Sequence, residues 1–386
     1  MSIVLSASVR QNLLSLQSTA DLLSTTQNRL ATGNKVNSAL DNPTNFFTAQ
    51  GLNNRASDIN NLLDSIGNGV QVLQAANTGI TSLQKLVDTA KSIANQVLQA
   101  PAGYTAKSTV SSVATLGTTA NADDLVDGTT LITGGVLSVT ATTGHAAFSY
   151  TLTATTSLAD LNTALAASNL SASLDSSNKL VFSTTNDTAS TTIGTVAVTT
   201  GTATFAAATA PVADAASQTI RSSLVKQYND IITQITTTSQ DASFNGINLL
   251  NGDDLKLTFN ETGKSTLNIK GVTFNAGGLG LASLASGTDF LDNSSANAAL
   301  VKLSSASTTL RTQASSLGSN LSVVQIRQDF NKNLINVLQT GSSNLTLADT
   351  NEEAANSQAL STRQSIAVSA LALANQSQQS VLQLLR

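Results

Sequence analysis

The chain has 386 residues, no cysteine, one histidine and a formal net charge of −4, and only 11% of its residues are charged. This composition excludes disulfides, thiolate metal sites and histidine-cluster metal sites, and it offers no basic footprint for nucleic acid. No stretch of about 18 residues is continuously apolar, so we expect no membrane span. We therefore expect no cofactor, no metal and no enzymatic activity.

Residues 1–33 are predicted to form one N-terminal coiled-coil helix. The opening MSIVLSASVRQNLL lacks the basic region, apolar run and cleavage site of a signal peptide, so none is expected. Apolar residues recur at heptad a and d positions and share one side of a helix. They are Val9, Leu13, Leu16, Leu23 and Leu30. Gly33 is the expected helix stop.

Residues 34–100 are predicted to form the first part of a rod domain. A turn at residues 41–44 precedes a helix over about 45–99, which a proline then ends. One seven-residue apolar frame continues from Leu52 to Leu98, a length that favours a coiled coil or bundle over a compact enzyme. The pair Phe46-Phe47 is expected in the core of this domain, with a partner site as the alternative.

Residues 101–212 are predicted to form a small β-rich domain. Apolar and polar residues alternate over 134–156 and 179–185, as they do in half-buried strands. Between these stretches, Ser157 and Asp160 have the spacing that caps a short helix.

Four polar residues of this domain are possible sites by residue type alone. A lone histidine in a strand is most often a surface residue, so His145 is expected to be exposed. Asp123, Asp124 and Asp127 could together suggest a cation site, but solvated loop residues are the favoured interpretation. None of the four predicts chemistry.

Residues 213–345 are predicted to complete the rod domain. A helical period covers 213–238, and a loop rich in turn residues follows. Alternating apolar residues on both sides of a turn at 260–264 then predict a β-hairpin. From about residue 296 a long helix resumes with its own seven-residue apolar frame.

Residues 346–386 are predicted to form a C-terminal coiled-coil helix after a short break. Between Gln364 and Leu385 this helix carries no charge. Its expected packing residues are Leu360, Leu371, Val381, Leu382, Leu384 and Leu385. The fold class is thus mainly α with a β insert: terminal coiled-coil helices, a long-helix rod domain with a hairpin, and a small β-rich domain.

The order of the elements predicts a chain that folds back, so that the first helix pairs with the last and long helix with long helix. A pair of helices cannot bury every apolar side chain of the terminal segments, and each one left in water forgoes about 1.5–3 kcal/mol. We therefore predict that the terminal helices fold on association with other copies. Association through two different patches produces a helical filament when the rotation does not close.

Three motifs resemble those of bacterial flagellin. The stretch RLATGNKVNSALDNPTNF (29–46) is similar to the segment after the first flagellin helix, with Gly33, Asn37 and Asp41 at recurring positions. SFNGINLLNG (243–252) resembles the family's F-N-G loop, formed here by Phe244, Asn245 and Gly246. SALALANQSQQSVLQLLR (369–386) resembles the family's C-terminal signature, which ends on Arg386.

The resemblance implies a structural subunit that polymerises into the flagellar filament for swimming motility, with the β-rich domain pointing outward. It implies an extracellular location and type III export without a cleaved signal peptide. The partners it implies are other copies of the chain, an export chaperone, the filament cap and hook-associated proteins. A hook–filament junction protein of the same family is the alternative, since such proteins have similar terminal helices.

Overall fold

The computed structural model describes residues 7–384, and the chain forms two compact units. The first unit contains Met1–Val70, Lys256–Leu267 and Ser322–Arg386, and the second contains Gln71–Leu255 and Asn268–Leu321. The predicted fold class, mainly α with a β insert, is confirmed by the order of the elements. Within residues 7–384 no helix has the length and apolar character needed to cross a membrane.

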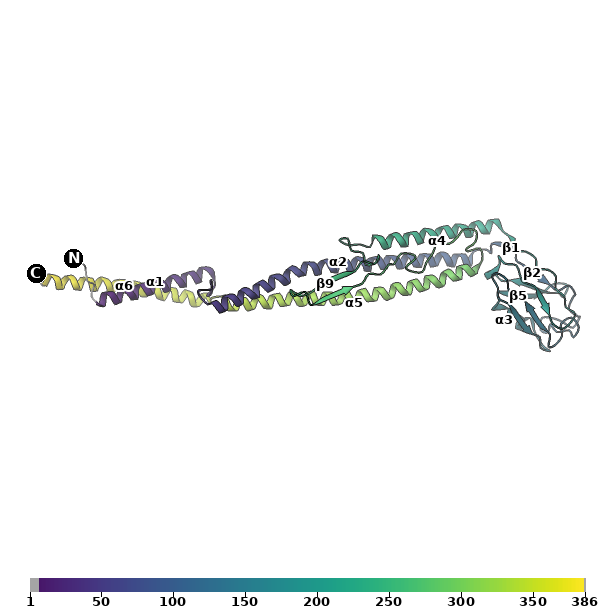
Figure 1. The fold of residues 1–386 in the computed structure, drawn as a ribbon, viewed down its shortest axis with the longest axis horizontal. Helices are drawn as coiled ribbons and strands as arrows, with labels where there is room; N and C mark the ends of the chain where they lie inside the picture. The colour runs from purple at the N-terminus through teal and green to yellow at the C-terminus, as the bar shows by residue number, and fades with distance from the viewer. Residues whose placement is uncertain (1–6, 385–386) are drawn as a thin grey trace. The chain divides into compact units, whose positions relative to one another are not determined.

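Two helices of the first unit bring the ends of the chain together. Helix α1 (Ala7–Thr32) packs along α6 (Thr350–Leu384), and Figure 1 shows the two side by side. The predicted pairing of the first helix with the last is therefore confirmed. Helices α1 and α6 together are called the terminal pair.

The long helices α2 (Pro43–Gln99) and α5 (Asn293–Thr346) also pack together in the first unit. Ala56 and Ile59 of α2 share one apolar core with Ile335 and Leu338 of α5. The seven-residue frame explains this contact, because it places one apolar stripe along each helix.

In the second unit, α4 (Ala215–Asp241) runs alongside α2 (Figure 1). The apolar frames of the long helices stay buried here, with Leu73, Ile80 and Val87 of α2 and Leu303 and Leu310 of α5 among the fully covered side chains. The heptad prediction thus holds along both long helices.

The β-rich region of the second unit contains two three-stranded sheets and one short helix. One sheet has the strand order β2-β6-β5 and the other β4-β3-β7, and every pair within them is antiparallel. The strands are β2 (Thr109–Ser111), β3 (Val136–Val139), β4 (Phe148–Thr151), β5 (Leu170–Leu174), β6 (Leu180–Thr184) and β7 (Val196–Val198). Helix α3 (Leu158–Ala166) begins at the predicted capping box, because Ser157 and Asp160 exchange hydrogen bonds.

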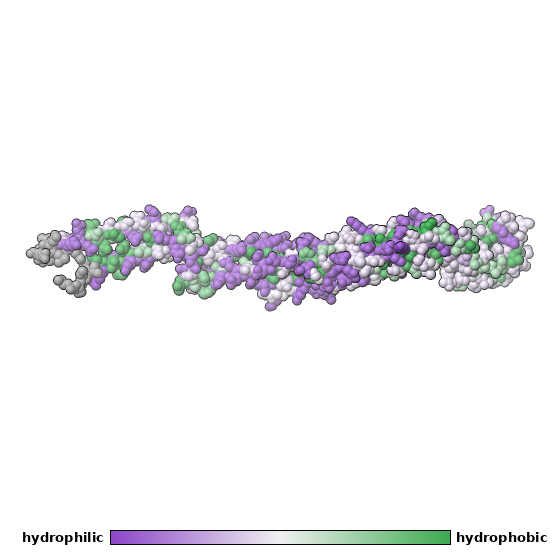
Figure 2. Space-filling model, turned by 90° about the horizontal axis from the view of Figure 1, so that it is seen from above, coloured by the Kyte–Doolittle hydropathy of each residue, from purple (hydrophilic) through white to green (hydrophobic). Residues whose placement is uncertain are grey.

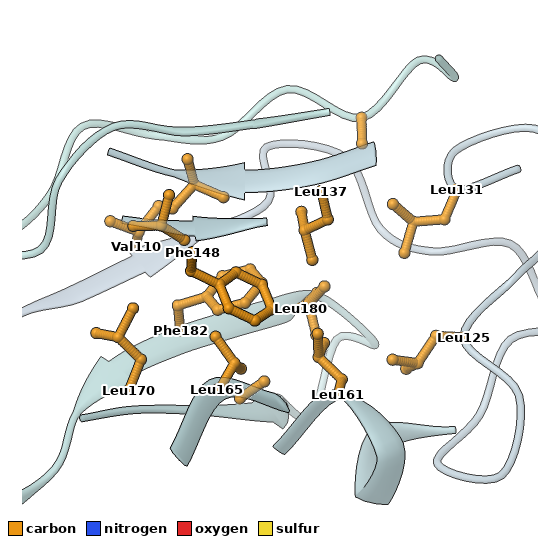
Figure 3. Packing of buried hydrophobic residues seen from close by; sticks show 14 of the residues in the cluster. Val110, Leu125, Leu131, Leu137, Phe148, Leu161, Leu165, Leu170, Leu180 and Phe182 are labelled. Atoms are coloured by element: carbon orange, nitrogen blue, oxygen red, sulfur yellow. The ribbon is translucent and has the colours of Figure 1, made fainter. Parts of the chain in front are cut away.

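One apolar core holds these sheets together (Figure 3). Leu137 and Phe148 from one sheet, Phe182 from the other and Leu161 and Leu165 from α3 all point into it. The region is closed off by a two-stranded pair, β1 (Tyr104–Ala106) with β8 (Val212–Ala213). The chain therefore enters and leaves the β-rich region through one neck.

The predicted hairpin is present. Strands β9 (Leu255–Thr258) and β10 (Thr266–Ile269) form a two-stranded sheet. The Phe259 N–H donates to the Ser265 carbonyl at 2.8 Å, and Gly263 takes the positive φ of 70° that the turn requires.

Two expectations about single side chains are wrong. His145 is buried rather than exposed: its Nε2 accepts from the Gly194 N–H at 3.3 Å and its Nδ1 lies 3.3 Å from the Ala146 carbonyl. Two ring nitrogens satisfied by backbone groups make burial of the ring possible. Phe47 is largely exposed rather than in the core, and only its neighbour Phe46 is half-buried.

Candidate self-assembly surface

The inner face of the terminal pair carries the residues predicted to pack. Val9 is buried, and Leu16, Leu23, Leu360 and Leu371 are half-buried. An ion pair between Arg29 of α1 and the largely buried Glu353 of α6, at 3.3 Å, fixes the two helices at one end. The predicted frame therefore faces the partner helix, although two helices alone do not bury it.

The outer face of the terminal pair is apolar as well. Figure 2 shows hydrophobic residues gathered on this part of the molecule. The exposed large apolar side chains of α1 and α6, which point to more than one side of each helix and are here together called the outer apolar face, are Leu14, Leu22, Ile366, Val368 and Leu373. Leu14 and Leu373 are 66% and 67% exposed, so the described residues leave both side chains open to contact with another molecule.

Several predicted residues are only partly covered or fall outside the described part. Leu13 and Leu30, both predicted to pack, are each more than a third exposed in the single chain. The side chains of Val381, Leu382 and Leu384, and the whole of Leu385 and Arg386, lie outside the described residues. Their roles in subunit packing stay predictions.

The loop after α1 is joined to the break between α5 and α6. Gly33 has a φ of 72° and ends α1, and its carbonyl accepts from the Ala348 N–H at 2.9 Å. The Lys35 N–H donates to the Thr346 carbonyl at 2.7 Å. The two chain breaks of the first unit are therefore hydrogen-bonded to each other. The positive φ at position 33 is what favours a glycine there.

Asp41 organises the turn that follows. Its Oδ2 accepts from the N–H groups of Asn37 at 3.0 Å and Ser38 at 2.9 Å. These hydrogen bonds hold the pKa of the Asp41 carboxyl below its ordinary value. The turn presents Leu40 to solvent at 96% exposure, so this leucine buries almost nothing within its own chain.

Helix α5 carries a second apolar stripe that the sequence analysis did not identify. Val323, Ile326, Phe330 and Val337, here called the α5 stripe, lie on its exposed side, whereas Val324 and Ile335 are buried. The spacing of 3, 4 and 7 residues within the stripe is itself a heptad pattern. This heptad spacing is the sequence signal for the α5 stripe. It is hard to recognise because the apolar frame on the buried side of the same helix is stronger.

The F-N-G loop has a structural role in the second unit. Phe244 and Ile247 exchange two backbone hydrogen bonds of 3.0 and 3.1 Å around Asn245 and Gly246, both of which have positive φ. This is the two-residue turn that Asn-Gly favours. The side-chain amide of Asn248 then donates to two carbonyls at the end of α4, so the loop caps that helix.

These surfaces are suited to apolar packing. Among the described residues, no three His, Cys, Asp or Glu side chains gather closely enough to hold a metal ion. The named members of the outer apolar face and the α5 stripe are uncharged side chains, so their burial would remove no charge from water. Full burial of each large side chain would contribute about 1.5–3 kcal/mol.

Both ends of the chain match the same family of known proteins. The bacterial flagellin N-terminal helical region matches residues 4–115, and the C-terminal helical region of the same family matches residues 300–385. Together these regions cover about half of the chain and include the terminal pair.

Curated flagellins align with parts of the chain. Flagellin FljM of Caulobacter vibrioides is 32% identical over 167 residues, or 43% of this chain and 60% of the relative. Flagellin FljO of the same organism is 31% identical over 179 residues, covering 45% and 64%. Flagellin A of Rhizobium meliloti is 37% identical over 90 residues, or 23% of each chain.

The alignments with the Caulobacter flagellins thus span roughly three-fifths of those relatives' own lengths. Both helical regions of the family are matched in order, the terminal helices pair as predicted, and the F-N-G loop forms the turn that its residues require. The chain belongs to the bacterial flagellin family.

Proposed function

We propose that this protein is a structural subunit that polymerises into the bacterial flagellar filament. The observation that carries the proposal is the outer apolar face of the terminal pair, because the described residues leave five large apolar side chains there exposed. Copies of the chain that pack side by side would cover them. Membership of the flagellin family supports the same function.

The α5 stripe and the Leu40 turn extend the proposed contact. Both lie in the first unit together with the terminal pair. A subunit of a helical polymer contacts its neighbours through two or more different patches, and the outer apolar face, the α5 stripe and the Leu40 turn supply three. We propose that the subunit-packing residues include these as well as the inner face predicted from the sequence.

A hook–filament junction protein is the alternative within the same family. The curated relatives are named flagellins, which supports the filament subunit over the junction protein. The proposed partners are other copies of the chain, together with an export chaperone, the filament cap and hook-associated proteins. The proposed location is the extracellular filament, and the proposed role involves no catalysis.

The proposal is tested by removing apolar surface from the terminal pair. The double variant Leu14→Ser/Leu373→Ser leaves the inner face intact, so the monomer should keep its unfolding temperature. If polymerisation buries both side chains, the variant loses about 3–6 kcal/mol per subunit added. The critical concentration for seeded polymerisation should therefore rise by at least about a hundredfold.

The matched control is Val113→Ser, which removes a side chain of similar exposure from the β-rich region. Sedimentation after seeding and negative-stain images would measure both variants. The control should polymerise like the wild-type protein. An unchanged critical concentration in the double variant would contradict the proposal.

A further inference from the structure

A buried arginine joins three helices at the base of the β-rich region. Arg221 of α4 is 2% exposed, yet it carries a charged guanidinium. That group donates to the carbonyls of Pro101 at 2.8 Å and Ala100 at 3.2 Å, just after α2 ends. It also donates to the Phe290 carbonyl at 2.8 Å and to Oδ1 of Asn293 at 3.2 Å, where α5 begins.

The segment that Arg221 holds before α5 has an unusual conformation. Phe290 is fully buried with a φ of 62°, a region that bulky residues rarely adopt. Its N–H donates to Oγ of Ser295 at 2.7 Å, and its ring packs edge-on against Tyr228 at 5.8 Å between centroids. Such a conformation persists only where the surroundings over-determine it, and Arg221 is one of those surroundings.

Asp292, within the same segment, reaches the β-rich region. Its Oδ2 accepts from Oγ of Ser190 at 2.6 Å, and Ser190 lies in the loop between β6 and β7. Burial, and after it the negative charge of Asp292, raises the pKa of Tyr104. Burial lowers the pKa of Arg221, and the charge of Asp292 opposes that shift. The carboxylate therefore lies close to both the neck and the guanidinium.

The neck alone would let the β-rich region rotate on the helices of the second unit. Tyr104 pairs with Ala213, and Gln218 of α4 donates to the Gly103 carbonyl at 3.1 Å, so these attachments all lie at one place. The bond from Ser190 to Asp292 is an attachment from a different part of the β-rich region. The neck is one tie made of two short strands, which by itself allows rotation. The bond from Ser190 comes from the loop between β6 and β7, so it is a second tie, beside the neck but from another part of the β-rich region, and it restricts that rotation.

We propose that Arg221, Asp292 and Ser190 form a latch that fixes the direction of the β-rich region on the helices of the second unit. Arg221 is the positioning residue: it holds the Phe290 carbonyl and the Asn293 side chain, on either side of Asp292 in the chain, and so aims Asp292 at Ser190. A lysine cannot do this, because it is a point charge without the planar fork that serves four acceptors at once. The inference goes beyond the proposed function, since it concerns the β-rich region rather than polymerisation.

The test measures the distance distribution between two labels. The chain has no cysteine, so Ala154→Cys in the β-rich region and Thr309→Cys on α5, both exposed, introduce the only thiols for spin labels. The latched protein should give one narrow distribution. Ser190→Ala and Arg221→Lys should each broaden it at least about twofold in width, while far-UV circular dichroism stays unchanged.

Thr202→Ala is the matched control, because its hydroxyl donates to the Thr129 carbonyl within the β-rich region only. It should leave the distribution narrow. If Arg221→Lys lowers the unfolding temperature, the decision rests on Ser190→Ala, which removes a single hydroxyl. A distribution as narrow as that of the control in Ser190→Ala overturns the latch.

Discussion

At the scale of single residues, Asp127 shows how a carboxylate that resembles a cation ligand builds a loop instead. Its Oδ1 accepts from the N–H groups of Thr129 at 2.9 Å, Thr130 at 2.6 Å and Leu131 at 3.0 Å. Its Oδ2 accepts from the Gly117 N–H at 2.6 Å. Burial raises the pKa of Asp127, but these hydrogen bonds outweigh burial and hold the pKa far below its ordinary value.

Asp127→Asn should destabilise the β-rich region at neutral pH. The asparagine keeps one acceptor for residues 129–131, but its NH₂ group would face the Gly117 N–H. We expect a loss of about 1–3 kcal/mol, nearer the lower value because solvent screens the carboxylate. Urea denaturation of this region would measure it.

The effect should depend on pH in one direction. Because the folded pKa lies below the unfolded value of about 3.9, the carboxylate stabilises the fold fully above that pH, and the contribution is lost as pH falls toward the folded pKa. Asp123→Asn is the control, since no hydrogen bond to that carboxylate exists among the described residues. Equal losses in the two variants would refute the role given to Asp127.

At the scale of elements, α5 carries two apolar stripes, one buried within the chain and one exposed. Leu303 and Leu310 belong to the buried stripe, and Val323 and Phe330 to the exposed one. Both stripes have helical spacing, so periodicity identifies them as faces of a helix. Which face is covered depends on where the neighbouring helices lie.

Leu310→Ala should cost about 2–5 kcal/mol of unfolding free energy, because it leaves a cavity in a closed core. Val301→Ala, on the same helix but 67% exposed, should change stability by no more than about 0.5 kcal/mol. Urea denaturation of the monomer followed by circular dichroism would compare them. Comparable losses would mean that the buried and exposed sides of α5 do not differ in the free chain.

At the scale of the whole molecule, the terminal pair should gain most of its stability from other copies. Two helices with one shared face and an apolar outer face bury too little surface to be firmly ordered alone. Anything that binds only the folded form stabilises it by mass action. We therefore expect the backbone amides of α1 and α6 to exchange hydrogen rapidly in the dilute monomer and slowly in the polymer.

Hydrogen exchange with mass spectrometry would measure this difference. The buried parts of α2 and α5 serve as the internal control, because their apolar cores are complete within one chain. They should be protected in both states. Strong protection of α1 and α6 in the monomer would show that the pair is stable without association.

The sequence by itself determined the helices, their frames and the family. The frame through Leu73, Ile80 and Val87 follows from the sequence because a heptad places about one apolar residue in each turn on one side of the helix. The Ser157–Asp160 cap and the Asn245-Gly246 turn are equally local, since each depends on residues within a few positions. The domain boundaries and the subunit-packing residues, which involve longer distances or other copies, stay predictions.

Only the tertiary structure decided which side chains are exposed to water and which groups far apart in the sequence come into contact. His145 is buried because Gly194, far along the chain, donates to its ring, and Phe47 is exposed because the rest of the chain leaves its side of α2 largely uncovered. Arg221 gathers acceptors from residues 100–101 and 290–293, separations for which no sequence period exists. Local pattern encodes the elements, whereas burial and long-range hydrogen bonds arise only when those elements pack.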